Sequence, residues 1–502
     1  MESLTNLMMG LGTALQPVNL FYCFVGVFIG TLVGVLPGIG PIGALSLLLP
    51  VTFHVPPLSA FIMLLGICYG SQYGGSTTSI LVNIPGEASS VVTCLDGYAM
   101  ARKGRAGPAL GMAAFASFFA GTISLFGLVF LAPTLANLGL RIGPPEYFAL
   151  MTFGLTLILY LSSSSIEKAL MMAAVGLILA MVGLDPISTR PRFTYGILAL
   201  RDGVGFAQVV IGLFGLSEVL VTVERSLKRE IFKTQIKGLF PTLQDWKDSF
   251  LPMTRASVLS FFMGIIPGMN VVIPTFVSYT LEKRISKHPE KFGTGVIEGV
   301  AAPEAANNAA AGGTLVPLLS LGIPTGATNA LVLGALMIYG LNPGPLLIKE
   351  SPQVFWGVIA SMYIGNGMLL LLNLPLIGIW VKILKLPYNI LFSMIILFCL
   401  IGSYTINSNI TDMYIMIFFG VLGYLMRKFK YEAPPLILAM VLGPLMETSL
   451  RRSIIISKGS FLIFFERPIS AIFLGLALLM LISPFITKKR LTRNILKEIE
   501  DQ

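Results

Sequence analysis

Long apolar runs alternate with short polar connectors along almost the whole chain. The runs lie at 18–35, 109–131, 169–182, 204–221, 354–372, 390–401, 413–425 and 469–486. The pattern predicts an all-α polytopic membrane protein with about 10–12 transmembrane helices, since roughly 20 apolar residues cross the hydrocarbon core. Their exact number stays open, because a broken apolar stretch can also form a hairpin that enters and leaves on one side.

Two of the apolar stretches are interrupted by the same residues. GVLPGIGP begins at Gly34 and GIIPGMN begins at Gly264, so a Gly-x-x-Pro-Gly core occurs twice. The following stretch is also duplicated: GGSTTSILVNIPGEAS begins at Gly74, and GGTLVPLLSLGIPTGAT begins at Gly312. Lipid cannot hydrogen-bond the backbone exposed at such breaks, so protein or a water-filled cavity must receive it. Matching breaks in two halves of a membrane protein indicate the substrate site of a transporter.

The duplication divides the chain into four predicted parts. These are a first membrane repeat (1–223), a basic cytoplasmic connector (224–256), a second membrane repeat (257–486) and a basic C-terminal tail (487–502). We expect the repeats to be inverted and to contain broken helices or re-entrant hairpins, because inversion brings both breaks to one site near the membrane midplane. The predicted hinges are Pro37, Gly38, Pro267 and Gly268.

Composition supports a membrane protein and explains the positive charge. Hydrophobic residues make up 55% of the chain and charged residues only 12%, with a net charge of +10. The cations lie in short connectors, which is typical of cytoplasmic loops rather than of a nucleic-acid surface. Because residues 1–101 contain no Lys or Arg, we expect the N-terminus outside and the C-terminus inside. The cations placed inside are Arg102, Lys103, Arg105, Arg190, Arg192, Arg201, Arg427, Lys428, Lys430 and those of the tail.

Polar side chains gather around the second duplicated stretch of each half. Pro85 and Gly86 end the first of these runs with a tight reversal. Amides freed at a helix start attract carboxylates, and hydroxyl oxygens suit a small cation such as Na⁺. The predicted substrate-binding residues are Ser76, Thr77, Asn83, Pro85, Gly86, Ala88, Ser89, Pro324, Thr325, Gly326 and Asn329. The predicted ion-coupling residues are Thr78, Ser79, Thr314, Thr328, Asn307, Asn308 and Glu304.

Each of these assignments has an alternative. Ser and Thr also occur in membrane helices simply because they allow close packing. Glu304 follows Pro303, which suggests a helix start, so its carboxylate is expected either to cap that helix or to couple a cation or proton. The same two roles are open for Glu87. The coupling ion is Na⁺ or H⁺; the ligands of a Na⁺ ion are not identified, and no other cofactor is expected.

Enzyme chemistry finds no support in the motifs. The chain has no Gly-x-x-x-x-Gly-Lys-Ser/Thr loop for ATP, no Gly-x-Ser-x-Gly elbow and no His-Glu-x-x-His. Its four cysteines have no paired spacing and are typical of small buried apolar residues. The sequence therefore predicts a protein that is not an enzyme.

The duplicated stretches resemble the large membrane subunit (permease) of tripartite tricarboxylate transporters. The resemblance covers essentially the whole chain, although Met269, Asn270, Pro274, Thr325 and Gly326 depart from the usual pattern. It implies a multi-pass permease of the bacterial inner membrane that uses an ion gradient. It also implies a small four-helix membrane subunit, a periplasmic solute-binding protein and a small organic acid as partners. The segments that carry the resemblance are 34–50, 69–111, 297–324 and 331–347.

These observations predict a secondary, ion-gradient-driven importer of a small organic carboxylate that depends on a binding protein. The alternative is the membrane permease of an ATP-driven importer, or a channel for another small solute. The duplicated breaks favour alternating access over an open pore.

Overall fold

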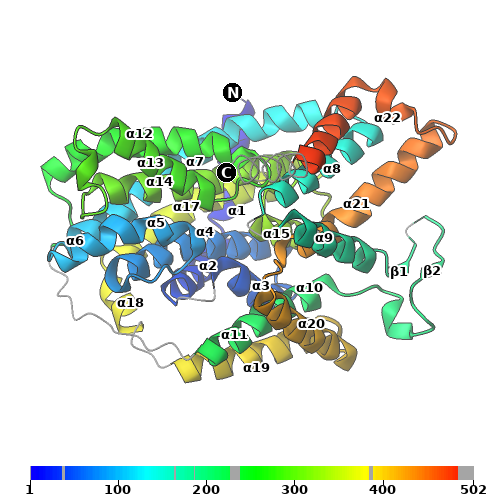
Figure 1. The fold of residues 1–502 in the computed structure, drawn as a ribbon, viewed down its shortest axis with the longest axis horizontal. Coiled ribbons are helices and arrows are strands. Elements are labelled where there is room, and N and C mark those ends of the chain that lie inside the picture. Colours follow the sequence, from blue (N-terminus) through cyan, green and yellow to red (C-terminus); the bar gives the residue numbers. More distant parts are fainter. Residues whose placement is uncertain are drawn as a thin grey trace, which may run out of the picture. The chain divides into compact units, whose positions relative to one another are not determined.

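The computed structural model describes residues 2–36, 40–162, 165–185, 187–225, 238–383 and 388–483. These residues form helices almost throughout, with one two-stranded antiparallel pair, and divide into two compact units (Figure 1). The first unit joins Met1–Gly139 to Gly205–Leu425, and the second joins Leu140–Val204 to Met426–Gln502. The predicted all-α polytopic fold is confirmed. The repeat boundaries predicted from the sequence are a different division of the chain and stay a prediction.

The first unit contains both duplicated stretches. Its helices up to the first unit boundary are α1 (Glu2–Ala14), α2 (Pro17–Val35), α3 (Gly40–Thr52), α4 (Pro57–Val82), η1 (Ala88–Ser90), α5 (Val91–Thr93), η2 (Cys94–Tyr98), α6 (Ala99–Arg102) and α7 (Ala106–Gly139). Its later helices are α10 (Phe206–Val210), η4 (Ile211–Leu216), α11 (Ser217–Arg225), α12 (Leu243–Ile265), α13 (Val272–Ile285), η5 (Pro289–Lys291), α14 (Glu298–Leu321), α15 (Ala327–Ile338), α16 (Pro345–Glu350), α17 (Pro352–Asn373), α18 (Ile377–Ile383), α19 (Tyr388–Asn407) and α20 (Ile410–Lys428), the last continuing past the unit boundary.

Five helices of the described chain are long and apolar enough to cross a membrane unaided. They are Pro17–Val35, Ala106–Gly139, Phe206–Glu224, Pro352–Asn373 and Ile410–Lys428. Shorter apolar helices lie at Gly40–Thr52, Ala327–Ile338, Phe392–Asn407 and Pro468–Ser483. The predicted total of about 10–12 crossings therefore stays a prediction.

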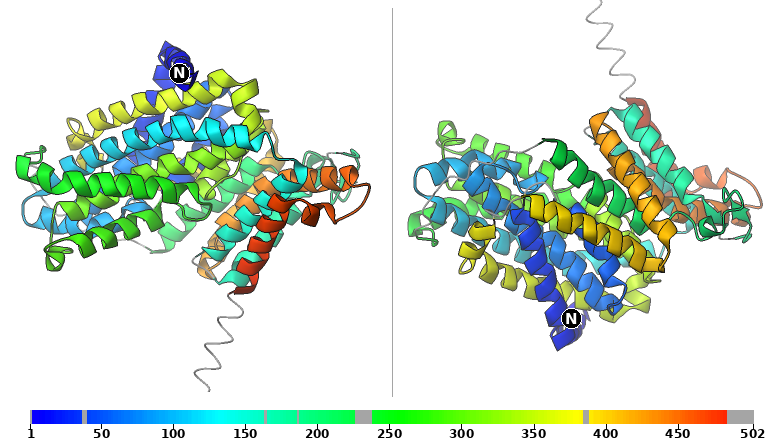
Figure 2. Two further views of the ribbon diagram at one scale, coloured as in Figure 1. Left: turned by 90° about the horizontal axis from the view of Figure 1, so that it is seen from above. Right: turned by 90° about the horizontal axis from the view of Figure 1, so that it is seen from below.

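Helices α4 and α14 form the centre of the first unit although both are rich in small and polar residues. They are 26 and 24 residues long, and nearly every residue of each is buried. A helix buried on all sides needs other helices around it: α4 packs on α2, α3, α7 and α17, and α14 packs on α7, α12 and α13. Figure 2 shows these helices lying alongside one another in the bundle.

The two duplicated stretches fold in the same way. In each, a helix ends at the Pro-Gly break, a shorter helix runs back, and a third helix follows the direction of the first: α2–α3–α4 and α12–α13–α14. Each third helix ends in a left-handed residue two positions before a proline. Asn83 has φ 58° before Pro85, and Gly322 has φ 71° before Pro324.

The two copies run in opposite directions. Asp96, soon after the C-terminus of α4, accepts hydrogen bonds from the Gly295 and Val296 amides at the N-terminal end of α14. The C-terminal end of α4 therefore lies beside the start of α14, and Figure 1 shows α4 and α14 side by side. This arrangement supports the prediction of inverted repeats.

Glycine allows the first and third helix of each copy to touch through their backbones. A Cβ at Gly34 of α2 would lie 2.1 Å from the Ser71 carbonyl oxygen of α4. A Cβ at Gly264 of α12 would lie 2.3 Å from the Ala310 carbonyl oxygen of α14. Each glycine lies three residues before a predicted hinge proline, so the same kind of contact holds the ends of α2 and α12 against α4 and α14.

The second unit is a small helical group with an ion-paired hairpin. It contains α8 (Pro144–Tyr160), α9 (Ile166–Ala180), β1 (Gly183–Leu184), β2 (Pro191–Arg192), η3 (Leu198–Leu200), α21 (Pro434–Ile456), α22 (Ile463–Glu466) and the helix Pro468–Ser483. Helices α9 and α21 run side by side in the same direction, since Gly176 contacts Leu436 and Ala180 contacts Gly443.

Charged groups occur at both ends of the α9–α21 pair. At its start, Lys168 donates to the Phe429 carbonyl (2.7 Å), beside the cationic residues 427–430. At its other end, Arg192 pairs with Glu447 (2.7 Å) and Arg451 pairs with Asp185 (2.9 Å). Arg192 thus belongs to the hairpin end of this pair, and the prediction that all cationic connectors share one face of the membrane stays a prediction. Spacing along the sequence did not reveal these ion pairs.

The Asp185 carboxylate organises the hairpin. Hydrogen bonds from the Ser188 and Ile187 amides, together with Arg451, hold the pKa of this carboxyl well below its usual range. The carboxylate stays ionised, and so remains paired, at every pH at which the protein would ordinarily be handled.

The glycine contacts predict that replacing either helical glycine with alanine lowers the stability of the protein. Gly34→Ala and Gly264→Ala should each destabilise the protein by about 1–3 kcal/mol through overpacking, although alanine favours helices. Thermal melts of the purified protein in detergent would measure this. Gly367→Ala in α17 is the matched control, because a Cβ there meets nothing within 4 Å. Equal melting temperatures for Gly34→Ala and Gly367→Ala would contradict the close contact.

Candidate functional site

Glu304 is the centre of a buried polar cluster in the first unit. Its side chain is 1% exposed and receives hydroxyl groups from three helices. Ser76 of α4 and Ser117 of α7 lie 2.6 and 3.3 Å from Oε2, and Thr93 of α5 lies 2.5 Å from Oε1. Because Ser76 and Glu304 come from opposite copies, the cluster joins the two.

The hydroxyl run after Gly75 lies within α4 rather than at its break. Ser76 and Ser79 contact the carbonyls of Gln72 and Gly75 one turn earlier (both 3.0 Å). Thr78 donates to the carbonyl of Val35 at the end of α2 (2.9 Å). Thr78 and Ser79 thus bond within the α2–α4 pair, which agrees with their alternative role in close packing, whereas Ser76 also contacts Glu304.

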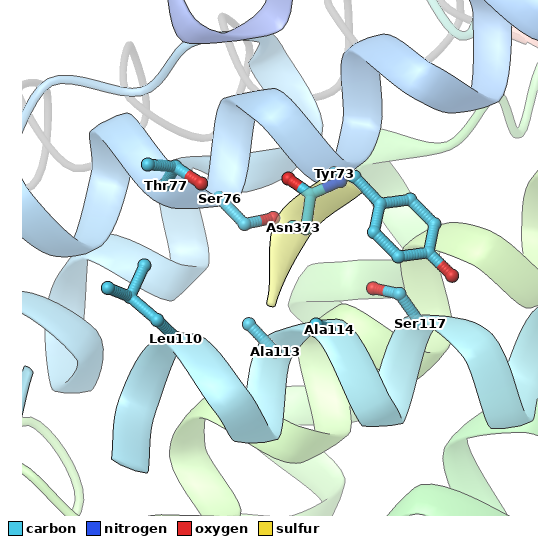
Figure 3. A pocket seen from close by; sticks show the side chains of 8 residues that line it. All are labelled: Tyr73, Ser76, Thr77, Leu110, Ala113, Ala114, Ser117 and Asn373. Carbon is cyan, nitrogen blue, oxygen red and sulfur yellow. The ribbon is translucent and has the colours of Figure 1, made fainter. Parts of the chain in front are cut away.

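A small cavity lies beside two of the hydroxyl groups that contact Glu304, and Figure 3 shows the side chains that line it. Two of its lining residues, Ser76 and Ser117, also contact the Glu304 carboxyl group. Thr77 and Asn373 contribute further polar atoms, and the Oδ1 atom of Asn373 is buried without a hydrogen-bond partner. The space holds about one water molecule. The other lining residues are Tyr73, Leu110, Ala113 and Ala114.

The loop after α4 is capped by the protein's own carboxylate. Glu87 and Ser90 form a reciprocal capping box at the start of η1, and the Ser89 hydroxyl also donates to Glu87. Asn307 of α14 contacts Glu87 Oε1 at 3.5 Å. For Glu87 the structure therefore supports the capping role. A carboxylate of the protein itself thus lies at this turn, and the prediction that freed amides after Pro85 hold a substrate carboxylate stays a prediction.

Packing limits which residues of this loop can face a ligand. A Cβ at Gly86 would lie 2.1 Å from the Gly34 carbonyl oxygen, so the loop rests directly on the end of α2. Ser89 is buried and Pro85 is half-buried, whereas Asn83 and Ala88 are exposed.

Hydrogen bonds join the second break, at Pro267 and Gly268, to the turn that follows α14. The Gly268 amide, in a left-handed residue (φ 84°), donates to the Thr325 carbonyl (2.9 Å). The Asn329 amide group donates to the Thr325 hydroxyl (2.9 Å) and to the Thr314 carbonyl (3.1 Å). The Thr314 hydroxyl donates to the Ala311 carbonyl (2.7 Å). These bonds fix the geometry of the turn between α14 and α15.

The start of α15 differs from the loop after α4. Gly326 is its N-cap residue and supplies no side-chain cap, and the following Thr328 is half-buried. Pro324 and Thr325 are buried just before it. Uncapped amides at a helix N-terminus form a ready anion site. Of the two predicted carboxylate sites, this one stays open to a ligand.

The predicted site residues therefore form two groups. Ser76, Ser89, Glu304 and Asn307 lie in or beside the first cluster, and Asn308 bonds the Glu304 carbonyl (3.3 Å). The second group comprises Gly268, Thr314, Pro324, Thr325, Gly326, Thr328 and Asn329. Among the described residues no hydrogen bond joins the two groups. Pro267 is half-buried in the second break. The predicted hinges Pro37 and Gly38 lie outside the described residues.

Glu304 does not begin a helix. Helix α14 begins at Glu298, and Pro303 lies inside it, so the capping role proposed for Glu304 is wrong. The acid at that helix start is Asp96, which sequence reasoning missed. Asp96 is fully buried and accepts hydrogen bonds from Tyr279 (2.8 Å) and from three amides of residues 293–296. The Gly-rich segment at 293–299 was the available signal for such a close approach.

No group of three or more His, Cys, Asp or Glu side chains suited to a metal ion occurs among the residues that the structure describes.

The helices and the site define a class. Two oppositely directed copies of a broken-helix unit, with a polar cluster joining them inside an apolar bundle, are the features of a polytopic membrane transport protein. The sequence profile of the "Tripartite tricarboxylate transporter TctA family" matches residues 20–438. The chain therefore belongs to the TctA family of tripartite tricarboxylate transporters, and the resemblance found from the sequence is confirmed.

Two relatives from Agrobacterium vitis are similar to this chain. One, described as "Uncharacterized 52.8 kDa protein in TAR-I ttuC' 3'region", is 48% identical over 493 residues, which cover 98% of each chain. The other, described as "Uncharacterized protein in TAR-II ttuC' 3'region", is 49% identical over 232 residues, covering 46% of this chain and 96% of its own length. No solved structure shows a significant match.

Removal of the Asp96 carboxylate should destabilise the protein. Asp96→Ala leaves several buried amides and the Tyr279 hydroxyl without an acceptor, at about 1–3 kcal/mol for each unsatisfied group. Thermal melts should show a large decrease in the melting temperature of Asp96→Ala. The melting temperature of Asp96→Asn should lie between those of the wild type and Asp96→Ala, because asparagine keeps one acceptor oxygen. Asp248→Ala is the control, since Asp248 is exposed on α12 near the same end. A melting temperature for Asp96→Ala equal to that of Asp248→Ala would refute this role.

Proposed function

We propose that the chain is the permease subunit of a binding-protein-dependent, ion-gradient-driven transporter that imports a small organic carboxylate. It would act in the bacterial inner membrane with a small four-helix membrane subunit and a periplasmic solute-binding protein. The coupling ion, Na⁺ or H⁺, is the only cofactor proposed, and no enzymatic step is involved.

One observation carries this proposal: the two copies of the broken-helix unit run in opposite directions and meet through Ser76 and Glu304. Such pseudo-symmetric halves can rock against each other and expose one site to alternate sides of a membrane. A channel has no need of this symmetry. The family name of the TctA relatives agrees with a carboxylate as the substrate class.

The open start of α15 is the proposed carboxylate site. Its first-turn amides and the positive end of its helix dipole would receive a substrate carboxylate without a nearby Lys or Arg. Asn329 and Thr325 lie in or next to this turn and would orient the anion, while the Gly268–Thr325 hydrogen bond holds the turn in shape. In the other copy, the Glu87 carboxylate lies at the corresponding position two residues after Pro85, which supports the proposal.

Reconstituted transport would test the proposed function. Vesicles containing the permease and its two partner subunits should accumulate radiolabelled di- or tricarboxylates when a Na⁺ or H⁺ gradient is imposed without nucleotide. Collapse of both gradients should abolish accumulation, because the gradient supplies the free energy. Accumulation that requires ATP, or a flux that only equilibrates the solute, would support the importer-permease or channel alternative instead.

A carboxylate introduced at the start of α15 should lower transport without lowering the stability of the protein. Gly326 has an extended backbone (φ −172°), and a Cβ there meets only the Asn270 Cβ at 3.7 Å, so substitution causes no strain. Gly326→Asp should cap α15, with a change in stability of up to about 2 kcal/mol in the favourable direction. Uptake should nevertheless fall strongly, because the new carboxylate occupies the substrate's place.

Gly326→Asn is the matched variant for this test. It offers a cap of the same shape without the negative charge, so it should retain more uptake than Gly326→Asp. Binding of the labelled carboxylate and thermal melts would be measured on both proteins. Equal uptake by the two variants would contradict the proposed anion site at the start of α15.

A further inference from the structure

We propose that Glu304 is protonated in this conformation and that it carries the coupling proton of the transporter. The inference rests on the proposed function for its coupling role, while the protonation itself stands on the geometry of the cluster. It names H⁺ as the coupling ion and Glu304 as its binding group.

The surroundings of Glu304 provide no cation to balance an ionised carboxylate. Among the described residues, no Lys, Arg or His forms a salt bridge with it, and its side chain is 1% exposed. Arg255 of α12, on the helix beside α14, is paired with Glu282 of α13 (2.5 Å). Taking an unpaired charge out of water is strongly unfavourable, so such a group takes its neutral form.

A count of hydrogens at Ser76 agrees with the neutral form. The Ser76 oxygen lies 2.6 Å from Glu304 Oε2 and 3.0 Å from the Gln72 carbonyl oxygen. A serine hydroxyl has one hydrogen, and a carbonyl can only accept. Both contacts are full hydrogen bonds when Glu304 donates its proton to Ser76 and Ser76 donates to Gln72. Thr93 and Ser117 then donate to the carboxyl group, so all four groups are satisfied.

Other titratable groups also oppose a negative charge on Glu304. Glu87, from the loop after α4, contacts Asn307 one helical turn from Glu304 and is itself an acid. Among the residues that the structure describes, Tyr73 of α4 and Cys94 of η2 also interact electrostatically with the Glu304 carboxyl, and each would gain only negative charge on ionisation. From α7 the facing group is the neutral Ser117.

The adjoining cavity offers a route for the proton. It shares Ser76 and Ser117 with the Glu304 cluster, and the unpartnered Asn373 oxygen, on a side chain that is 4% exposed, lines it. A water bound between Asn373 and Ser76 would exchange a proton with Glu304. One proton would bind the carboxylate from the outer side and leave it to the inner side per cycle, and no other bond would change.

Infrared spectroscopy of the full-length chain in lipid vesicles tests the protonation, with the proton itself as the probe. At neutral pH the wild type should show the C=O stretch of a buried carboxylic acid. Glu304→Gln should remove this band and Glu87→Gln should retain it. Absence of the band in the wild type, or its survival in Glu304→Gln, would overturn the proposal.

A second pair of variants covers the case in which Glu304→Gln does not fold. Ser76→Ala removes the hydrogen-bond acceptor of the acid, so the band should shift in frequency. Thr77→Ala, in the same cavity but without a bond to Glu304, should leave it unchanged. Identical bands in both variants would also overturn the proposal.

Transport decides whether the proton is the coupling ion. In vesicles with the partner subunits, Glu304→Gln should reduce accumulation of a labelled carboxylate under a pH gradient by roughly tenfold or more. Exchange of labelled for unlabelled carboxylate without a gradient should continue, because it needs no net proton movement. Unchanged pH-driven accumulation in Glu304→Gln would refute coupling. If the wild type carries no carboxylate at all, the proposed function fails, while the infrared band still decides the protonation.

Discussion

The need to satisfy backbone hydrogen bonds away from water governs this structure. Each copy of the broken-helix unit interrupts its helices inside an apolar bundle, and lipid could not receive the peptide groups that such a break frees. The protein solves this with close backbone packing: Gly34 and Gly264 bring each first helix onto its third helix. The Gly268 amide donates a hydrogen bond to the Thr325 carbonyl, and the Thr78 hydroxyl donates one to the carbonyl of Val35. The breaks exist only because α4 and α14 are surrounded by other helices, which is also why these two helices can be polar.

The same constraint produces an asymmetry between the two copies. In the first, Glu87 forms a capping box with Ser90 at the start of η1, whereas in the second the start of α15 has no side-chain cap. A substrate carboxylate needs a helix start whose backbone amides have no partner in the protein. It gains little binding energy from amides that are already hydrogen-bonded. The two similar turns therefore differ in one carboxylate, Glu87, for which the second copy has Gly326.

The sequence predicted the fold well where a single physical signal dominated. Apolar runs located α2, α7, α17 and α20, and the repeated Pro-Gly breaks identified the paired units. Helices α4 and α14 carry a weaker signal, because their burial by protein removes the demand for apolar residues. The role of Glu304 could not be predicted, because its partners Ser76 and Ser117 come from distant parts of the chain. Pro303 suggested a helix start, but α14 begins at Glu298, just after the Gly295 amide that donates to the Asp96 carboxylate.

Buried acids in this protein differ in function because their partners differ. Asp96 faces several amide donors and the Tyr279 hydroxyl, which together stabilise an anion and fix the start of α14. Glu304 faces hydroxyls, and a hydroxyl can either donate or accept. A shell of hydroxyls can therefore follow the carboxyl group through both protonation states by rotating, without moving the backbone. Backbone amides cannot reverse in this way, so Asp96 is suited to structure and Glu304 to proton exchange.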